Sequence, residues 1–181
     1  MIAIPQGGRY TPRVIDPLTR LPLRLAMRSL YAILKLRWFV SRPNSTGAHA
    51  IALTPASRII LVKLRYVGGW RVPGGGVDAG EKPEVAVLRE LREEIGMTSH
   101  GAVRNAFRSE ERITWRNDSS TIFVVTEVEY APRWSLEIEA VTEAPLDRLP
   151  PGTSERTRRW LARARPIVDG LPLHADGDTP R

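Results

Sequence analysis

The chain contains no cysteine and only three histidines among its 181 residues. Without cysteine, disulfide bonds, thiolate nucleophiles and cysteine-based zinc sites are excluded. His49, His100 and His174 lie far apart and show none of the short spacings of histidine metal motifs. The sequence therefore gives no indication of a metal bound by thiolate or imidazole groups.

Acidic residues are nearly absent from the first 42 residues, which hold eight basic residues and only Asp16. This segment accounts for the whole net charge of +7, because the remaining chain has 19 basic and 19 acidic residues. A domain that binds duplex nucleic acid is expected to carry the basic patch itself. The neutral remainder of this chain therefore argues against duplex binding.

Residues 18–41 contain no uninterrupted apolar run of the length that a membrane-spanning helix requires. They predict instead a basic amphipathic helix that begins near Pro22. Basic residues recur every four or seven positions, and beside them runs an apolar stripe of Leu23, Met27, Leu30, Leu34 and Trp38.

Two roles for this helix stay open. An arginine-rich, acid-poor helix can lie on an anionic membrane surface or serve as a transit-type segment. It can also pack against the domain or against a partner chain, such as the second copy of a homodimer, and most amphipathic helices pack in this way. Basic residues interrupt the apolar region and no small-residue cleavage site follows, so a secretory signal is not expected. We expect a cytoplasmic protein, with peripheral membrane contact as the alternative.

A turn-rich linker at 41–47 separates this extension (1–45) from an α/β domain predicted over 46–166. Helices are predicted from about Lys82 to Ile95, with Pro83 in the first turn and Gly96 at the end, and over 153–165. Strands are predicted at 48–54, 57–66, within "GGWRVPGGG", and at 101–115, 120–130 and 136–142. Residues 167–181 are expected to form a disordered tail.

The stretch "RELREEIG" places Glu90, Glu93 and Glu94 three and four residues apart, so on a helix they share one side. The other side carries the apolar residues Val85, Leu88, Leu91 and Ile95, which must face the core. Clustered carboxylates without thiol or imidazole favour a hard cation such as Mg²⁺ or Mn²⁺. The alternative is a solvated, salt-bridged face, since Arg89 and Glu93 form an i,i+4 pair.

A glycine-rich loop, "PGGGVDAGE", leads from a strand into this helix. Glycines let the backbone approach a phosphate closely, and the amides of such a loop can face an anion. A carboxylate-bound cation beside a phosphate-binding loop suggests phosphoryl or nucleotidyl chemistry.

The spacing across Gly75–Met97 resembles the Nudix box, G-x5-E-x7-R-E-U-x-E-E-x-G-U, where U is aliphatic. Every position matches, from Gly75 through Glu81, Arg89 and Glu90 to the end of the box. The resemblance to the Nudix hydrolase superfamily (MutT-like) extends over about residues 46–166 and implies an α/β/α sandwich with a mixed sheet. It also implies Mg²⁺- or Mn²⁺-dependent hydrolysis of a nucleoside diphosphate linked to a moiety X.

The resemblance implies a role for each matching residue. Glu93 and Glu94 would bind the metal with the carbonyl of Gly75, and Glu90 would be a further ligand or the base that orients water. Arg89 would hold Glu90 in position. The supporting positions would be Glu81, Gly74, Gly76 and Gly96.

Candidates outside the box are less clearly marked by the pattern. Glu137 and Glu139, and more weakly Glu111, are candidates for an additional carboxylate, with a solvated strand face as the alternative. Trp70 and Trp115 are candidates for stacking on a base, with packing as the alternative. Marks of the ADP-ribose, dinucleoside-polyphosphate and NADH subfamilies are missing, so X is not identified.

The sequence thus predicts a hydrolase that acts on a small-molecule nucleoside diphosphate derivative. Two alternatives stay open. One is a Nudix-fold module that binds or senses a nucleotide without turnover. The other is a membrane-associated hydrolase of a lipid diphosphate, brought to its substrate by the basic helix.

Overall fold

The computed structural model describes residues 44–113, 116–133 and 135–171, together with positions 22, 25, 26, 29 and 30. Those five positions are helical and exposed. The rest of the predicted N-terminal helix and the chain from residue 172 onward lie outside the described residues. Within the described part, no helix is long and apolar enough to cross a membrane.

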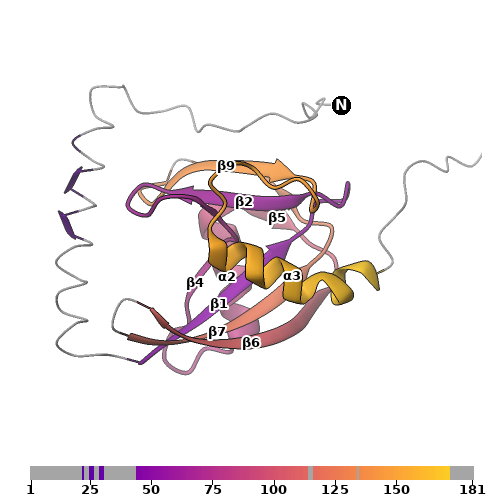
Figure 1. Ribbon diagram of the computed structural model, residues 1–181, viewed down its shortest axis with the longest axis horizontal. Helices are drawn as coiled ribbons and strands as arrows, with labels where there is room; N and C mark the ends of the chain where they lie inside the picture. Colours follow the sequence, from indigo (N-terminus) through magenta and orange to yellow (C-terminus); the bar gives the residue numbers. More distant parts are fainter. Residues whose placement is uncertain are drawn as a thin grey trace, which may run out of the picture.

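Along the chain, two groups of strands are each followed by one helix (Figure 1). In order they are β1 (Asn44–Ala52), β2 (Ile59–Leu64), β3 (Trp70–Arg71), β4 (Gly74–Gly76), α2 (Pro83–Ile95), β5 (Met97–Ser99), β6 (Val103–Ile113), β7 (Arg116–Val125), β8 (Glu129–Tyr130), β9 (Ile138–Ala144) and α3 (Glu155–Asp169).

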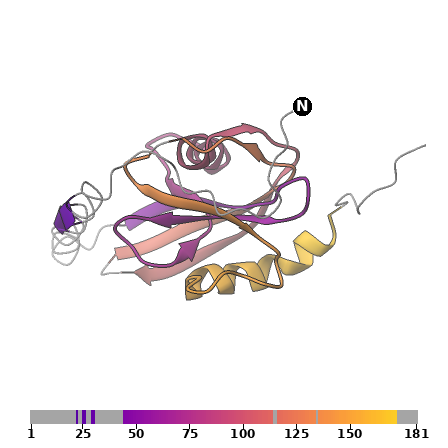
Figure 2. The same ribbon diagram turned by 90° about the horizontal axis from the view of Figure 1, so that it is seen from above.

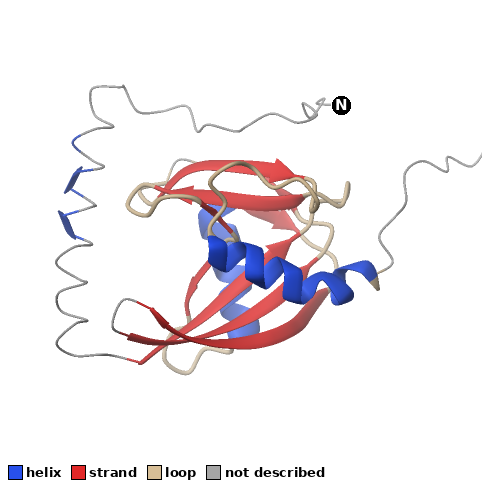
Figure 3. Cartoon of the chain, viewed as in Figure 1, coloured by secondary structure: helices blue, strands red, loops and turns tan. Residues whose placement is uncertain are grey.

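The strands form a four-stranded sheet of order β4-β1-β7-β6, a three-stranded sheet of order β3-β2-β9 and the pair β5-β8. β1 and β7 are parallel, whereas β1–β4 and β6–β7 are antiparallel, so the larger sheet is mixed, as predicted. Helices α2 and α3 lie on opposite sides of the strands (Figure 2). Figure 3 shows α3 crossing in front of the strands and α2 behind them. The α/β/α sandwich is confirmed.

The alternation of side chains along the strands divides the core into two clusters. In β1, Ala48, Ala50 and Ala52 belong to the cluster beneath α2, whereas Ile51 belongs to the cluster beneath α3. In β2, Ile60 and Val62 face α2, and Ile59 and Leu61 face α3. Small alanines under α2 leave room for that helix to lie close to β1, which brings its carboxylates near β4.

Several predicted boundaries were wrong, among them the following three. β1 begins at Asn44, inside the predicted linker, because Ser45 and Thr46 pair with β7. The strand predicted at 120–130 divides into β7 and β8, since Glu127 between them has a φ of 51°. α3 continues to Asp169, past the predicted start of the tail, because Val168 and Leu171 extend its buried stripe.

Helix α2 begins with Pro83 and ends at Gly96, as the sequence predicts. Its buried residues are Ala86, Val87, Leu91 and Ile95, whereas Val85, predicted to face the core, is 54% exposed. At 100° per residue, Val85 lies about 120° around the helix from Leu91, so it faces outward. Glu94, in contrast, lies beside Val87 and Leu91 and is drawn toward the core.

Gly96 ends α2 in the left-handed conformation, with a φ of 68°, and a Cβ there would collide with the backbone of Ala131. We expect Gly96→Ala to lower the free energy of unfolding by about 2–3 kcal/mol, through strain plus displacement of the chain near Ala131. Gly152→Ala is the matched control, because Gly152 has a φ of 76° but open space around it. Urea denaturation should show a loss of only about 1 kcal/mol there; equal losses would contradict the collision.

Candidate active site

The glycines of β4 allow a carboxylate and a neighbouring strand to approach the backbone. Gly74, Gly75 and Gly76 pair with His49, Ala48 and Gly47 of β1. A Cβ on Gly75 would lie 2.6 Å from an oxygen of the Glu90 carboxylate, and one on Gly74 would collide with the backbone of β1. Side chains are therefore excluded at these two positions by direct contact.

Glu94 is bound to this glycine strand. The Gly74 N–H donates to Glu94 Oε2 at 2.8 Å. Although part of the side chain remains accessible, the protein surrounds it, and this burial raises the pKa of Glu94 to about 8. The nearby charges of Glu90 and Glu137 act in the same direction, and Arg71 opposes them. A cation beside Glu94 would stabilise its ionised form, which burial disfavours.

Arg89 connects the loop to the helix. Its Nε and Nη2 donate to the two oxygens of Glu81 at 3.1 and 3.0 Å, and Nη2 also donates to the Gly76 carbonyl at 2.9 Å. Its Nη1 donates to Glu90 Oε1 at 2.8 Å, which is the contact predicted from the sequence. Glu81 in turn accepts a hydrogen bond from the Asp78 N–H at 3.0 Å. These bonds raise the pKa of Arg89 and lower that of Glu81.

The three helical carboxylates differ in burial rather than sharing one environment. Burial raises the pKa of Glu90, against the lowering effect of Arg89. The Glu93 side chain is 60% exposed and lies 3.5 Å from Arg89 Nη1. Within the described residues, no three acidic or imidazole groups are gathered into a ready ligand shell.

The donor set nevertheless fits a hard divalent cation. Glu90 and Glu94 face the glycine strand, and burial raises the pKa of each because it removes water that would stabilise the ionised form. Oxygen ligands of this type suit Mg²⁺ or Mn²⁺. Glu93 could join them by a rotation of its exposed side chain, and the Gly75 carbonyl belongs to the same strand.

The three candidate carboxylates outside the box lie in different parts of the structure. Glu137 lies close enough to raise the pKa values of Glu90 and Glu94. Glu139 lies 4.0 Å from the Lys63 ammonium group. Glu111 is bound on the α3 side, 3.2 Å from Arg159. The structure therefore brings Glu137, and not Glu111, to the carboxylate cluster.

The two tryptophans also separate. Trp70 packs against the core cluster beneath α3, away from the carboxylates beneath α2. The next residue, Arg71, faces the other way and lowers the pKa of Glu94, so sequence reasoning missed a charged member of the site. Strand alternation could have indicated it. Trp115 lies outside the described residues.

Comparisons with known proteins identify the family of this chain. The sequence model of the NUDIX domain matches residues 43–164 of this chain. The chain belongs to the NUDIX domain family. It resembles the crystal structure of a MutT NUDIX hydrolase from Burkholderia pseudomallei, with 26% identity and a TM-score of 0.59 over 67% of this chain and 97% of that one.

Two further proteins are similar over different lengths. An RNA pyrophosphohydrolase of Rhodospirillum rubrum is 48% identical over 74 residues, which are 40% of this chain and 41% of that protein. The NUDIX domain of Shewanella oneidensis NrtR, crystallised with ADP-ribose, is 18% identical with a TM-score of 0.59. The match covers 69% of this chain and 88% of that one. The chain spans less than half the length of the curated relatives it matches.

The raised pKa of Glu94 predicts a pH-dependent stability in the absence of divalent cations. Because the folded state binds the proton more tightly than the unfolded state, stability is greatest below about pH 4.5 and falls as the pH rises toward 8. The loss should be up to about 4 kcal/mol in urea denaturation with EDTA. Glu94→Gln is the control, since it keeps the shape and removes the titration. A wild-type slope between pH 5 and 8 equal to that of Glu94→Gln would contradict the assignment.

Proposed function

We propose that this protein is a divalent-cation-dependent pyrophosphohydrolase that cleaves a nucleoside diphosphate linked to a moiety X. The observation that carries this proposal is the bond from the Gly74 amide to Glu94, beside the contact of Glu90 with Gly75. Carboxylates with raised pKa values therefore lie against the glycine strand, and the open space beside Gly76 leaves room for a phosphate to approach the backbone there.

Glu90, Glu93, Glu94 and the Gly75 carbonyl would hold Mg²⁺ or Mn²⁺. When bound, such a cation polarises the phosphate oxygens and lowers the pKa of bound water. Arg89 fixes Glu90 through Nη1 and fixes the loop through Glu81 and the Gly76 carbonyl. Glu90 is then oriented as a ligand or as the base for the attacking water. Glu137 is the additional carboxylate nearest to this group.

The names of the relatives narrow the classes of X to test. The R. rubrum protein is an RNA pyrophosphohydrolase, and the S. oneidensis domain was crystallised with ADP-ribose. We therefore propose nucleotide substrates, including the 5′ end of RNA, as the first class. The basic charge of the chain lies in residues 1–42, so contact of longer RNA with that segment is compatible with the neutral charge of the domain.

Glu94→Gln should reduce kcat by about 10²-fold or more, because the amide cannot supply the charge that holds the cation. The fold should persist, since an amide oxygen can still accept from the Gly74 N–H. Glu84→Gln is the matched control, because Glu84 is an exposed acid in the first turn of the same helix. Release of phosphate or pyrophosphate, measured with Mg²⁺ and with Mn²⁺, checks this prediction.

The substrate panel for that assay should contain nucleoside triphosphates with normal and oxidised bases, 5′-triphosphorylated RNA, ADP-ribose, dinucleoside polyphosphates, NADH and a prenyl diphosphate. Metal-dependent turnover that survives Glu84→Gln and is lost in Glu94→Gln would identify X. Full activity in Glu94→Gln would refute the role of this carboxylate.

A NUDIX module that binds a nucleotide without cleaving it is the second candidate, and the ADP-ribose-bound S. oneidensis domain favours it. The two candidates separate in the same assay. Saturable binding of ADP-ribose or another member of the panel, without turnover in Mg²⁺ or Mn²⁺, would establish the module in place of the enzyme.

We further propose that the protein is cytoplasmic and contacts anionic membranes through its N-terminal segment. Leu25 and Leu30 are 55% and 52% exposed, and residues 1–42 carry a net charge of +7. The full chain should bind vesicles containing phosphatidylserine, more weakly at high salt, and should not bind neutral vesicles. Deletion of residues 1–42 should abolish this binding in a sedimentation assay. Equal binding by the full and shortened chains would contradict the proposal.

A further inference from the structure

The glycine strand β4 has no side chains with which to hold its own conformation. Among the described strands, Gly74, Gly75 and Gly76 also form the edge of the larger sheet, with β1 as their only neighbour in that sheet. Gly74 has a φ of 136°, a conformation that only glycine adopts readily. The position of the Gly74 amide, and so of its bond to Glu94, therefore depends on side chains that other elements supply.

His49 supplies such a side chain on the α3 side of the strand. A Cβ on Gly74 would lie 2.8 Å from His49 Nδ1, and a Cβ on Gly47 would lie 3.2 Å from His49 Nε2. The imidazole thus occupies the space that side chains at these two glycines would fill. On the α2 side, the Glu90 carboxylate covers Gly75 in the same way. The backbone of β4 is confined from both sides.

Trp160 of α3 packs against the His49 imidazole. The ring centroids of His49 and Trp160 are 5.0 Å apart, and the ring planes are inclined by 46°. Trp160 is 4% exposed, and its Nε1–H donates to Ser109 Oγ at 3.3 Å. The indole is therefore fixed both by burial and by a bond to β6.

Arg156, one turn earlier in α3, fixes the indole in turn. Its guanidinium carbon lies 4.1 Å from the centre of the Trp160 ring. The guanidinium group donates to Asp118 and to Ser120 Oγ, the latter at 2.9 Å. Asp118 also accepts from Ser45 Oγ at 2.7 Å. These bonds anchor the start of α3 to β1 and β7.

The contacts form a continuous series from Asp118 through Arg156, Trp160 and His49 to Gly74 and Glu94. We propose that Arg156, Trp160 and His49 act as a positioning column that fixes the Gly74 amide and, through it, the Glu94 carboxylate. His49 is a positioning residue in this proposal, acting by the shape of its ring. The consequence for turnover rests on the proposed function, whereas the effect on the Gly74 amide does not.

Ordinary core packing would give a different result. If the column served only stability, its loss would weaken the whole fold and expose all core amides equally. If it positions β4, its loss should release the Gly74 amide beyond what the general loss of stability explains. Val168→Ala is the matched control, because Val168 is a buried residue of the same core cluster but lies eight residues beyond Trp160, near the C-terminal end of α3.

The first test is hydrogen exchange of the Gly74 amide, followed by NMR on the full chain in EDTA. We expect His49→Ala to increase the exchange rate of this amide at least about tenfold more than Val168→Ala does, after both are compared at equal global stability. His49→Phe should restore slow exchange, since a flat ring still covers Gly74. Exchange in His49→Ala no faster than in Val168→Ala would overturn the column.

The second test uses whichever substrate the Mg²⁺ assay identifies. His49→Ala should lower kcat about tenfold with little change in KM, because a displaced Glu94 affects the reaction more than substrate binding. His49→Phe should recover kcat, and Val168→Ala should leave it unchanged. Recovery of slow Gly74 exchange without recovery of kcat in His49→Phe would overturn the positioning role in favour of a direct contact of the imidazole with substrate. A wild-type protein without turnover would refute the proposed function, while the exchange measurement would still decide the column.

Discussion

The hydrogen bond from the Gly74 amide to Glu94 is the constraint on which the rest of the site depends. A carboxylate at a helix position that faces the core loses much of its hydration, and one backbone N–H replaces only part of it. Breaking this bond would leave a buried acceptor without its partner, at a cost of about 1–3 kcal/mol. The bond therefore fixes α2 against β4 and sets the separation between the helical carboxylates and the glycine backbone.

The carboxylates near this bond outnumber the two guanidinium groups that face them. Glu81, Glu90 and Glu93 share one guanidinium, Arg89, and Glu81 takes two of its hydrogen bonds. Glu94 and Glu137 add charge that Arg71 offsets in part. Burial is the main cause of the raised pKa values of Glu90 and Glu94, and the neighbouring acidic groups raise them further. Such a group is most stable when a further cation joins it, which is the physical basis of the proposed activity.

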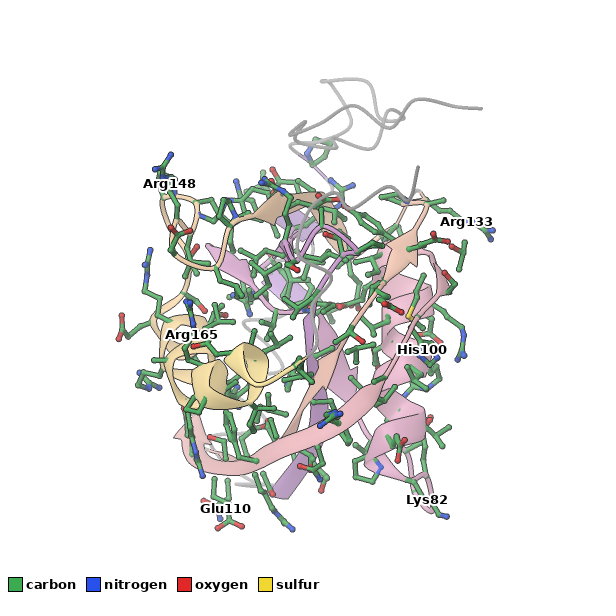
Figure 4. The ribbon with its side chains drawn as sticks, turned by 90° about the vertical axis from the view of Figure 1, so that its right-hand side faces the viewer. Lys82, His100, Glu110, Arg133, Arg148 and Arg165 are labelled. Carbon is green, nitrogen blue, oxygen red and sulfur yellow. The ribbon has the colours of Figure 1, made fainter. Side chains whose placement is uncertain are left out.

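The two helices contribute to the site in different ways. α2 packs over the small residues of β1 and carries the carboxylates of the site. α3 lies on the opposite side, with Arg165 and Lys82 marking the two sides of the molecule in Figure 4. Through Trp160 and His49, however, α3 reaches the same glycine strand from behind. The strand is thus held between one helix that supplies carboxylates and another that supplies aromatic packing.

The sequence by itself determined the family and the extent of α2 between Pro83 and Gly96, whereas the contact of Arg89 with Glu90 was implied by the family resemblance. These features depend on local spacing and on backbone preferences, which a short stretch of chain already contains. Only the tertiary structure decided that Glu94 is enclosed while Glu93 is exposed, that Val85 faces outward, and that Trp70 and Glu111 belong to the α3 side. Each of these depends on which neighbouring element covers a given side of a helix or strand. Residues far apart in the chain, such as His49 and Trp160, meet only when the sheets and helices pack, and no local pattern specifies that meeting.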